Sequence, residues 1–264
     1  MDGFFSLPQN LVPFSTKLPP SSNENIQIQL ALNPIIQNQA YKIRHQGYFS
    51  YNYITKREGD LFYDKYDGRQ NVRTAVIYKN DIPAATVRLC LFDATGTYPD
   101  ADTVPAMEIF NSEIREMMDG FSRSNRPKRA VEVTRLARVP EFANDKAIIS
   151  ALFRAVGYLI LHFDADIVLN ACRPHHMPMY RRFGFQKIEE PRQYPNLTYK
   201  AALMACFRSS YGALRDNLTF LRDISTQDST YAGLISGERT TLQRGDERDD
   251  RLHTVFEPQV RMAA

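Results

Sequence analysis

Apolar positions follow two different spacings along this chain, and the alternation between them predicts a mixed α/β protein. The strongest pattern is an apolar stripe of helical spacing between residues 147 and 163, which predicts a helix with one buried face. Strand-like spacing appears at residues 72–78, 84–92, 130–139, 166–171, 185–188 and 198–206. Shorter stretches of helical spacing appear at residues 34–53, 106–118, 174–182 and 213–221. The expected product is a central sheet flanked by helices.

Cap and turn residues mark where some of these elements begin and end. Asn33 before Pro34 is typical of a helix start, because the asparagine side chain caps the first turn and proline fits the first helical position. Asn80 and Asp81, between the first two strand patterns, predict the turn of an antiparallel hairpin.

The two ends of the chain differ from its centre. Residues 1–30 hold several prolines among Asn, Gln and Ser and show no sustained helical period, which predicts an irregular N-terminal extension. Residues 31–206 carry the ordered pattern and are expected to form one domain. Residues 207–264 are expected to form a C-terminal extension, partly helical and, in its polar and charged part from residue 225, largely flexible.

Composition narrows the class of protein. The chain has 264 residues, of which 43% are hydrophobic, and a net charge of only +3, so it can bury a full core and gives no strong reason to expect nucleic acid. The N-terminus lacks the features of a signal peptide, and no apolar run approaches the roughly 18 residues of a membrane span. We therefore expect a cytoplasmic protein without a transmembrane segment.

The three cysteines are Cys90, Cys172 and Cys206, and none forms a CxxC spacing. An odd and scattered set argues against a disulfide framework and against a thiolate metal site. We expect buried structural thiols, and neither a metal nor a redox cofactor.

The order of elements after residue 130 carries a family resemblance. In the segment YRRFGFQKI, Tyr180, Gly184 and Phe185 resemble the Tyr-x-x-x-Gly-Phe segment that ends the core of GNAT acyltransferases. The resemblance implies the GNAT fold, a mixed sheet in which two parallel strands, here residues 131–139 and 166–171, splay apart. In that family an acyl-thioester lies between them, where unpaired backbone groups can bind the amide-rich pantetheine arm.

One departure from that family concerns the donor. GNAT enzymes that use acetyl-CoA follow the first splayed strand with a glycine-containing loop whose amides hold the CoA pyrophosphate. The corresponding stretch here, VPEFANDKA, has no glycine and places Glu141 and Asp145 where the pyrophosphate would lie. The departure favours the acyl-phosphopantetheine of an acyl carrier protein over acyl-CoA as the donor.

Two further segments resemble acyl-homoserine-lactone synthases. FYDKYDG at 62–68 is similar to their Phe-Asp-x-Tyr-Asp signature, and EVTRLARV at 132–139 is similar to their Glu-x-Ser-Arg-Phe-x-Val strand. Arg44 and Arg88 match two further basic positions. The same strand resembles that of long-chain N-acyl amino acid synthases, and the chain lacks the Trp that lactone synthases usually carry after the first helix's arginine. The resemblance therefore favours the N-acyl amino acid synthases.

Acyl transfer to an amine needs a route for the amine proton and donors for the thioester oxyanion. Glu132 is the candidate base, with a pKa raised by partial burial; the alternative is a carboxylate paired with Arg135. These two residues are three apart and face opposite sides of a regular strand, so both can serve one site only if a β-bulge intervenes. The amide of Ala137 or Arg138, freed by the splay, is the candidate oxyanion donor.

The remaining candidates have two possible roles each. The following residues are expected either to bind substrate or to form a network that fixes the structure: Arg44, Asp64, Tyr66, Asp67, Arg88, Arg135 and Tyr180. Arg135 either clamps a substrate carboxylate or orients the first helix through one of the two aspartates. His175 and His176 have no metal-ligand company and are expected to cap or pack, or to take part in carrier binding or proton transfer.

A basic patch near the open end of the splayed strands would suit an acidic carrier protein. The candidate docking residues in the segment SRSNRPKR are Arg123, Arg126, Lys128 and Arg129, and a plain solvated loop is the alternative. Met107, Ile109 and Phe110 either line an acyl tunnel or pack in the core.

Three functions follow from these observations. The first is transfer of a medium or long acyl chain from acyl carrier protein, or acyl-CoA, to the amine of an amino acid or derivative. The second is homoserine-lactone synthesis with S-adenosylmethionine. The third is an inactive GNAT fold that serves as a binding module.

Overall fold

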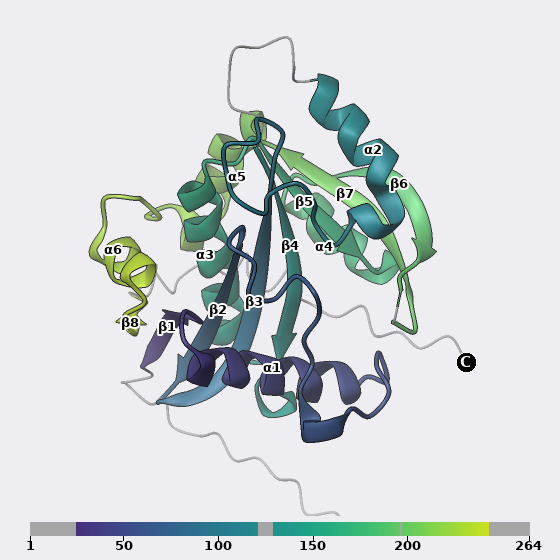
Figure 1. Ribbon diagram of the computed structural model, residues 1–264. Coiled ribbons are helices and arrows are strands. Elements are labelled where there is room, and N and C mark those ends of the chain that lie inside the picture. The colour runs from purple at the N-terminus through teal and green to yellow at the C-terminus, as the bar shows by residue number, and fades with distance from the viewer. Residues whose placement is uncertain (1–24, 121–128, 196, 243–264) are drawn as a thin grey trace, which may run out of the picture.

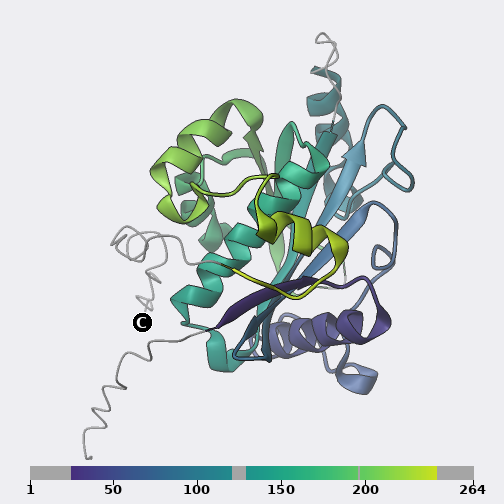
Figure 2. The same cartoon turned by 90° about the vertical axis from the view of Figure 1, so that its left-hand side faces the viewer.

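The computed structural model describes residues 25–120, 129–195 and 197–242, and it contains an eight-stranded sheet with helices on both faces (Figure 1, Figure 2). The strands are β1 (Ile26–Leu30), β2 (Val72–Lys79), β3 (Ile82–Asp93), β4 (Arg129–Arg138), β5 (Ile167–Cys172), β6 (Gln186–Gln193), β7 (Lys200–Phe207) and β8 (Thr240–Thr241). The α-helices are α1 (Pro34–Phe49), α2 (Met107–Gly120), α3 (Lys146–Phe163), α4 (Met177–Arg182), α5 (Tyr211–Asn217) and α6 (Ser229–Ser236).

The strand order is β6-β7-β5-β4-β3-β2-β1-β8. Among the described strands only the central pair, β4 and β5, is parallel, and the other neighbours are antiparallel. The expected mixed sheet with one central parallel pair is therefore confirmed.

Alternation along the strands distributes apolar side chains between two faces. Ala75 and Leu89 belong to the core that α3 covers, whereas Val76 and Tyr78 pack under α1. Cys90, on the same face as Val76, packs in the cluster under α2. Helices α1 and α2 therefore cover one face of the sheet, and α3 covers the other (Figure 1).

Helix α3 is long and apolar enough to cross a membrane by length and composition, with 18 residues and a mean hydropathy of 1.4. The expectation that no apolar run approaches that length is therefore wrong. The structure nevertheless buries 56% of this helix, which packs along β1 to β4 as the core of its face. No second helix of this kind occurs in the part of the chain that the structure describes.

The central parallel pair separates after three residue pairs. Pairing runs from Ala130 with Ile167 to Glu132 with Leu169, although both strands continue beyond that point. The first carbonyl past the separation, that of Val133, accepts a hydrogen bond of 2.9 Å from the side-chain amide of Asn170. We call the space between β4 and β5 beyond Glu132 the wedge. It is the splay that the family resemblance predicted.

A β-bulge interrupts β4 directly after the point of separation. Thr134 pairs with Arg88 and Ala137 pairs with Thr86, so two residues of β4 stand opposite one residue of β3. Arg135 takes a left-handed backbone conformation, with φ of 52°. The extra residue turns the Arg135 side chain to the face on which Glu132 lies, and the geometric condition set by the sequence is thereby met.

Several boundaries differ from the sequence predictions. The predicted irregular extension over residues 1–30 is wrong at its end, because Ile26–Leu30 forms β1, whose alternate residues are buried against β2. In the C-terminal extension, β8 pairs with β1, so this segment completes the sheet edge. The rest of the expected irregular and flexible segments, residues 1–24 and 243–264, lies outside the described residues. The helix predicted to reach residue 53 ends at Phe49.

A substitution at Gly47 can test how closely α1 packs against β4. A Cβ atom at Gly47 would lie 2.7 Å from the carbonyl oxygen of Arg138, closer than such atoms can approach. We expect Gly47→Ala to lower the free energy of unfolding by about 1–3 kcal/mol, measured by urea denaturation, because helix and strand must move apart.

Gly212 is the matched control, because it also lies in a helix but a Cβ there would meet no atom within 4 Å. Gly212→Ala should be neutral or stabilise by up to about 1 kcal/mol, since alanine is the better helix former. Equal effects of both substitutions would contradict close packing at Gly47.

Candidate active site

Glu132 lies where the two central strands separate, and only 1% of its surface is exposed. Its Oε2 accepts a hydrogen bond of 2.6 Å from the backbone N–H of Ala106, just before α2. Burial raises the pKa of Glu132 to about 7, against the opposing effects of this hydrogen bond and of the Arg88 guanidinium. Such a carboxyl group is half ionised near neutral pH, where a general base is most effective.

Two aspartates of the 62–68 segment hold three buried arginines together. Arg88 Nη1 lies 2.7 Å from Asp64 Oδ1 and 3.0 Å from Asp67 Oδ1. Arg44 Nη1 lies 2.8 Å from Asp67 Oδ1, and Arg135 Nη2 lies 2.6 Å from Asp64 Oδ2. The arginines come from α1, β3 and the bulge of β4, so the aspartates join three elements that are distant in sequence.

The aspartates are ionised and also hold their own loop. Burial would raise the pKa of Asp64, but the hydrogen-bonded guanidinium groups of Arg88 and Arg135 outweigh it and hold that pKa well below its usual range. Asp67 Oδ2 accepts from the backbone N–H of Asp64, and Asp64 Oδ1 accepts from that of Tyr66. These contacts are those of the structural network; a role of the same residues in substrate binding stays a prediction.

The register of β4 distinguishes between the two candidate oxyanion donors. The N–H of Val139 donates to the carbonyl of Ala84 in β3 at 3.0 Å, and Ala137 pairs with Thr86 of the same strand. Successive amides of a strand point to opposite edges, so the N–H groups of Ala137 and Val139 face β3. The N–H of Arg138 points the other way, toward the wedge, and Ala137 is excluded as a backbone donor to it.

An apolar cavity of about 280 Å³ opens on the α3 face next to the point of separation. Its walls include Val133 of β4, Val168 of β5 and Tyr180 of α4, together with residues of α3 and α5. Tyr180 is buried, and burial raises its pKa well above the ordinary value. Tyr180, one of the candidate substrate-binding residues, therefore lines a cavity that touches both β4 and β5.

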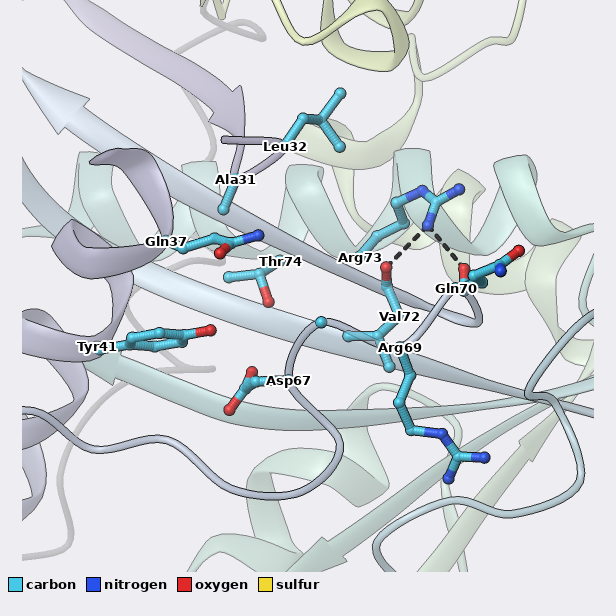
Figure 3. Close-up of a pocket in the computed structure, with 11 residues that line it drawn as sticks. Ala31, Leu32, Gln37, Tyr41, Asp67, Arg69, Gln70, Val72, Arg73 and Thr74 are labelled. Atoms are coloured by element: carbon cyan, nitrogen blue, oxygen red, sulfur yellow. Dashed lines mark hydrogen bonds between the residues drawn. The ribbon is translucent and has the colours of Figure 1, made fainter. Parts of the chain in front are cut away.

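A second cavity, of about 230 Å³, is polar and lies on the other side of the aspartate network. Figure 3 shows Gln37 and Tyr41 of α1, Thr74 of β2 and Asp67 around it. The negative charge of Asp67 is already balanced by its ion pairs with Arg44 and Arg88.

The segment from residue 39 to residue 206, more than half of the chain, matches a protein-family model described as N-acyl amino acid synthase FeeM. The chain belongs to the FeeM family of N-acyl amino acid synthases. It is therefore an N-acyltransferase, as the sequence motifs predicted.

Solved structures with the same fold include enzymes of both kinds that the sequence resembled. FeeM from uncultured soil microbes is similar over 77% of this chain and 100% of its own, with 15% identity and a TM-score of 0.57. BjaI, a CoA-dependent acyl-homoserine lactone synthase solved with MTA, is similar over 81% of this chain and 100% of its own, with 16% identity and a TM-score of 0.50. At these identities the likeness shows the fold alone. No curated protein matches the chain.

The other candidates of this FeeM-family chain lie away from Glu132 or outside the described residues. Arg123, Arg126 and Lys128 belong to residues 121–128, which are not described. Arg129 lies at the paired end of β4, opposite to the open end of the wedge, and its Nη1 donates to the carbonyl of Phe163. Docking at this segment stays a prediction.

The tunnel candidates and the cysteines lie in the core. Met107 and Phe110 are buried in the cluster between α2 and the sheet, Ile109 packs against it, and none of the three lines the apolar cavity. The three cysteines are free and buried as expected, and burial raises the pKa of Cys90 and of Cys172 to about 12. Within the described residues, no three His, Cys, Asp or Glu side chains group as a metal site would require.

Several aromatic residues near the site were not singled out from the sequence. Burial raises the pKa of Tyr194, and the charge of Glu132 raises it further, which places this phenol near the candidate base. Tyr48 and Phe62 lie against the Arg135 guanidinium, with Phe62 4.6 Å from it. Their spacing along the chain is irregular, so only the fold brings them to one place.

Asp64 is the residue on which the charged network most depends. Asp64→Asn leaves the buried Arg88 and Arg135 short of negative charge, and we expect the free energy of unfolding at pH 7 to fall by about 3 kcal/mol in urea denaturation. Because the folded pKa of Asp64 is lowered, its contribution is present above an unfolded pKa near ~4 and is lost as the pH falls below it. The difference between wild type and variant should therefore shrink in acid.

Asp81→Asn is the control for this prediction. Asp81 pairs with Arg239 at the surface, where its side chain is 77% exposed, so its loss should cost less than about 1 kcal/mol. A stable Asp64→Asn variant would show that the arginines need no counter-charge.

Proposed function

We propose that this enzyme transfers an acyl chain from the phosphopantetheine of an acyl carrier protein to the α-amine of an amino acid or a close derivative. The observation that carries the proposal is the wedge with a buried carboxyl group of raised pKa at its apex. In a FeeM-family chain this arrangement suits one reaction, attack of an amine on a thioester held between the strands.

The two faces of the sheet would receive different parts of the reaction. The apolar cavity touches the wedge from the α3 side and suits the acyl chain. The Glu132 side chain points to the opposite face, under α2, with Tyr66 and Tyr194 near it. The amine would therefore approach from the α1 and α2 side while the acyl chain extends to the α3 side.

The reaction forms a C–N bond and breaks the thioester C–S bond. Glu132 takes the proton of the amine, through water, as the nitrogen attacks the carbonyl carbon. The N–H of Arg138 donates to the carbonyl oxygen as it gains negative charge. When the tetrahedral intermediate collapses, the C–S bond breaks and the sulfur receives, through water, the proton that Glu132 took from the amine, so that the products are an amide and a free thiol.

The start of α3 supports a carrier protein as the donor. The side chain of Asp145 accepts from the backbone N–H groups of Ala147 and Ile148, and its Oδ2 lies 2.6 Å from Lys79 Nζ. A carboxylate already occupies the helix terminus that would otherwise receive a CoA pyrophosphate. A carrier protein brings no pyrophosphate and needs no such site. A cytoplasmic location fits this donor.

The Glu132→Gln variant tests the proposal directly. Purified wild type should form an N-acyl amino acid from acyl carrier protein and an amino acid, detected by mass spectrometry, with a rate that rises as the pH passes about 7. In the variant kcat should fall by about 10²- to 10⁴-fold, and the ionisation near neutral pH should vanish from the profile.

Glu116→Gln, an exposed position on α2, provides the same change away from the wedge and should keep wild-type activity. Unchanged transfer by Glu132→Gln would overturn the assignment of the base. Acyl-homoserine lactone as the product, formed only with S-adenosylmethionine, would favour the second function.

The apolar cavity predicts a change in chain-length preference. Val168 is 2% exposed and lines the cavity from β5, so Val168→Phe would take up part of its volume. We expect the product profile to shift to shorter acyl chains, measured by mass spectrometry with a mixture of carrier-bound acyl groups. Val168→Ala should leave longer chains acceptable, and an unchanged profile in the Phe variant would mean that the chain lies elsewhere.

A further inference from the structure

Arg173 is the first residue after β5, at the open end of the wedge. Its guanidinium carbon lies 3.8 Å from the ring centre of Tyr53 and 5.4 Å from that of Tyr199. Its Nη2 lies 3.2 Å from Nε2 of His176. Aromatic rings and a neighbouring imidazole therefore hold this cation in one place.

Arg173 differs from the arginines near Glu132 in that no carboxylate of the described residues forms an ion pair with it. Arg44, Arg88 and Arg135 are each bound to an aspartate. Among the described residues, Arg173 forms no ion pair with a carboxylate, and its buried Nη1 has no hydrogen-bond partner. A buried N–H donor of a charged group without a partner is costly, and together with the missing carboxylate it makes Arg173 a candidate to bind an anion.

The surroundings of Arg173 are positive and partly dry. Burial, and then the charge of Arg173, lower the pKa of His176 to about 3, so this imidazole is neutral and can accept from the guanidinium. Arg138, at the end of β4 across the wedge, also acts on His176. Its Nη1 donates to the carbonyl of Ala143, and it too forms no ion pair with a carboxylate within the described residues. Two cations thus flank the open end of the wedge.

The distance from the reaction centre selects the kind of anion. Arg173 lies four residues beyond Leu169, the partner of Glu132, which is about 13 Å along an extended chain. The carboxylate of an α-amino acid is only one carbon away from the reacting amine, so it cannot reach Arg173. The phosphate of a phosphopantetheine arm lies about thirteen bonds from the sulfur, which corresponds to roughly 15 Å when extended.

We propose that Arg173, supported by His176 and with Arg138 opposite, binds the phosphate of the donor's phosphopantetheine arm. The inference rests on the proposed function for the identity of the donor. It assigns to two arginine side chains the task that a glycine-rich loop performs in CoA-dependent GNAT enzymes.

Binding of 4′-phosphopantetheine and of pantetheine without the phosphate, measured by calorimetry, tests the proposal without requiring turnover. Wild type should bind the phosphorylated compound at least about tenfold more tightly, because a charge-assisted contact to a half-buried guanidinium contributes at least that much. Arg173→Gln should reduce this preference to near unity, and Arg173→Lys should retain part of it. Thermal unfolding of each variant checks that it is folded.

Arg182→Gln is the matched control, since Arg182 is an exposed arginine of α4 and should keep the wild-type preference. A wild-type protein that ignores the phosphate, or an Arg173→Gln variant that keeps the preference, would overturn the inference. So would a variant whose only defect is a raised KM for the amino acid. Failure of wild type to transfer any acyl group, with the phosphate preference intact, would instead contradict the proposed reaction.

Discussion

The rest of the site depends on the loss of pairing between β4 and β5 beyond Glu132 and Leu169. A parallel pair in the middle of a sheet normally continues its hydrogen bonds along both strands, because an unpaired buried amide is costly. Here the first open carbonyl is satisfied by the Asn170 side chain, and the bulge at Arg135 interrupts β4 just beyond it. Beyond this point the backbone N–H and C=O groups on the facing edges of β4 and β5 do not pair with each other and face the wedge, which is narrowest at Glu132.

The charged network stabilises this arrangement. A residue with a left-handed backbone conformation in the middle of a strand is strained. The ion pair between Arg135 and Asp64 stabilises the bulge against this strain. The same aspartate binds Arg88, and Asp67 binds Arg44, so the first helix, the third strand and the bulge are joined through one short loop. Glu132 remains outside these ion pairs. Its pKa is therefore set mainly by burial, as a base near neutral pH requires.

The two faces of the sheet differ in the polarity of their side chains near the wedge. The α3 face is apolar up to the wedge and contains the cavity, whereas the opposite face carries the carboxyl group, the phenols and the arginines. An acyl-thioester that lies in the wedge would place its chain on one face and its carbonyl carbon within reach of the other. The polar end of the donor would then lie at the open end of the wedge, next to Arg173 and Arg138.

The sequence by itself determined the class of fold and the family, and it proposed Glu132 as the base. Those conclusions depend on local patterns: the helical stripe of residues 147–163, the spacing of the 62–68 and 132–139 segments, and the glycine that ends the short helix at 184. It also stated the need for a bulge, since a strand of period two cannot place Glu132 and Arg135 on one side. β1 was missed although Ile26, Ile28 and Leu30 alternate with Gln27 and Gln29, because this short strand follows the proline-rich segment and was grouped with it.

Only the tertiary structure decided which partners the charged residues take. It assigned Arg135 to Asp64 instead of Glu132, turned the Arg138 amide to the wedge, and left Arg173 without a carboxylate among the described residues. The reason is that such pairings join residues many positions apart, and the distance between them depends on how helices and strands pack. Periodicity within one segment carries no information about those distances.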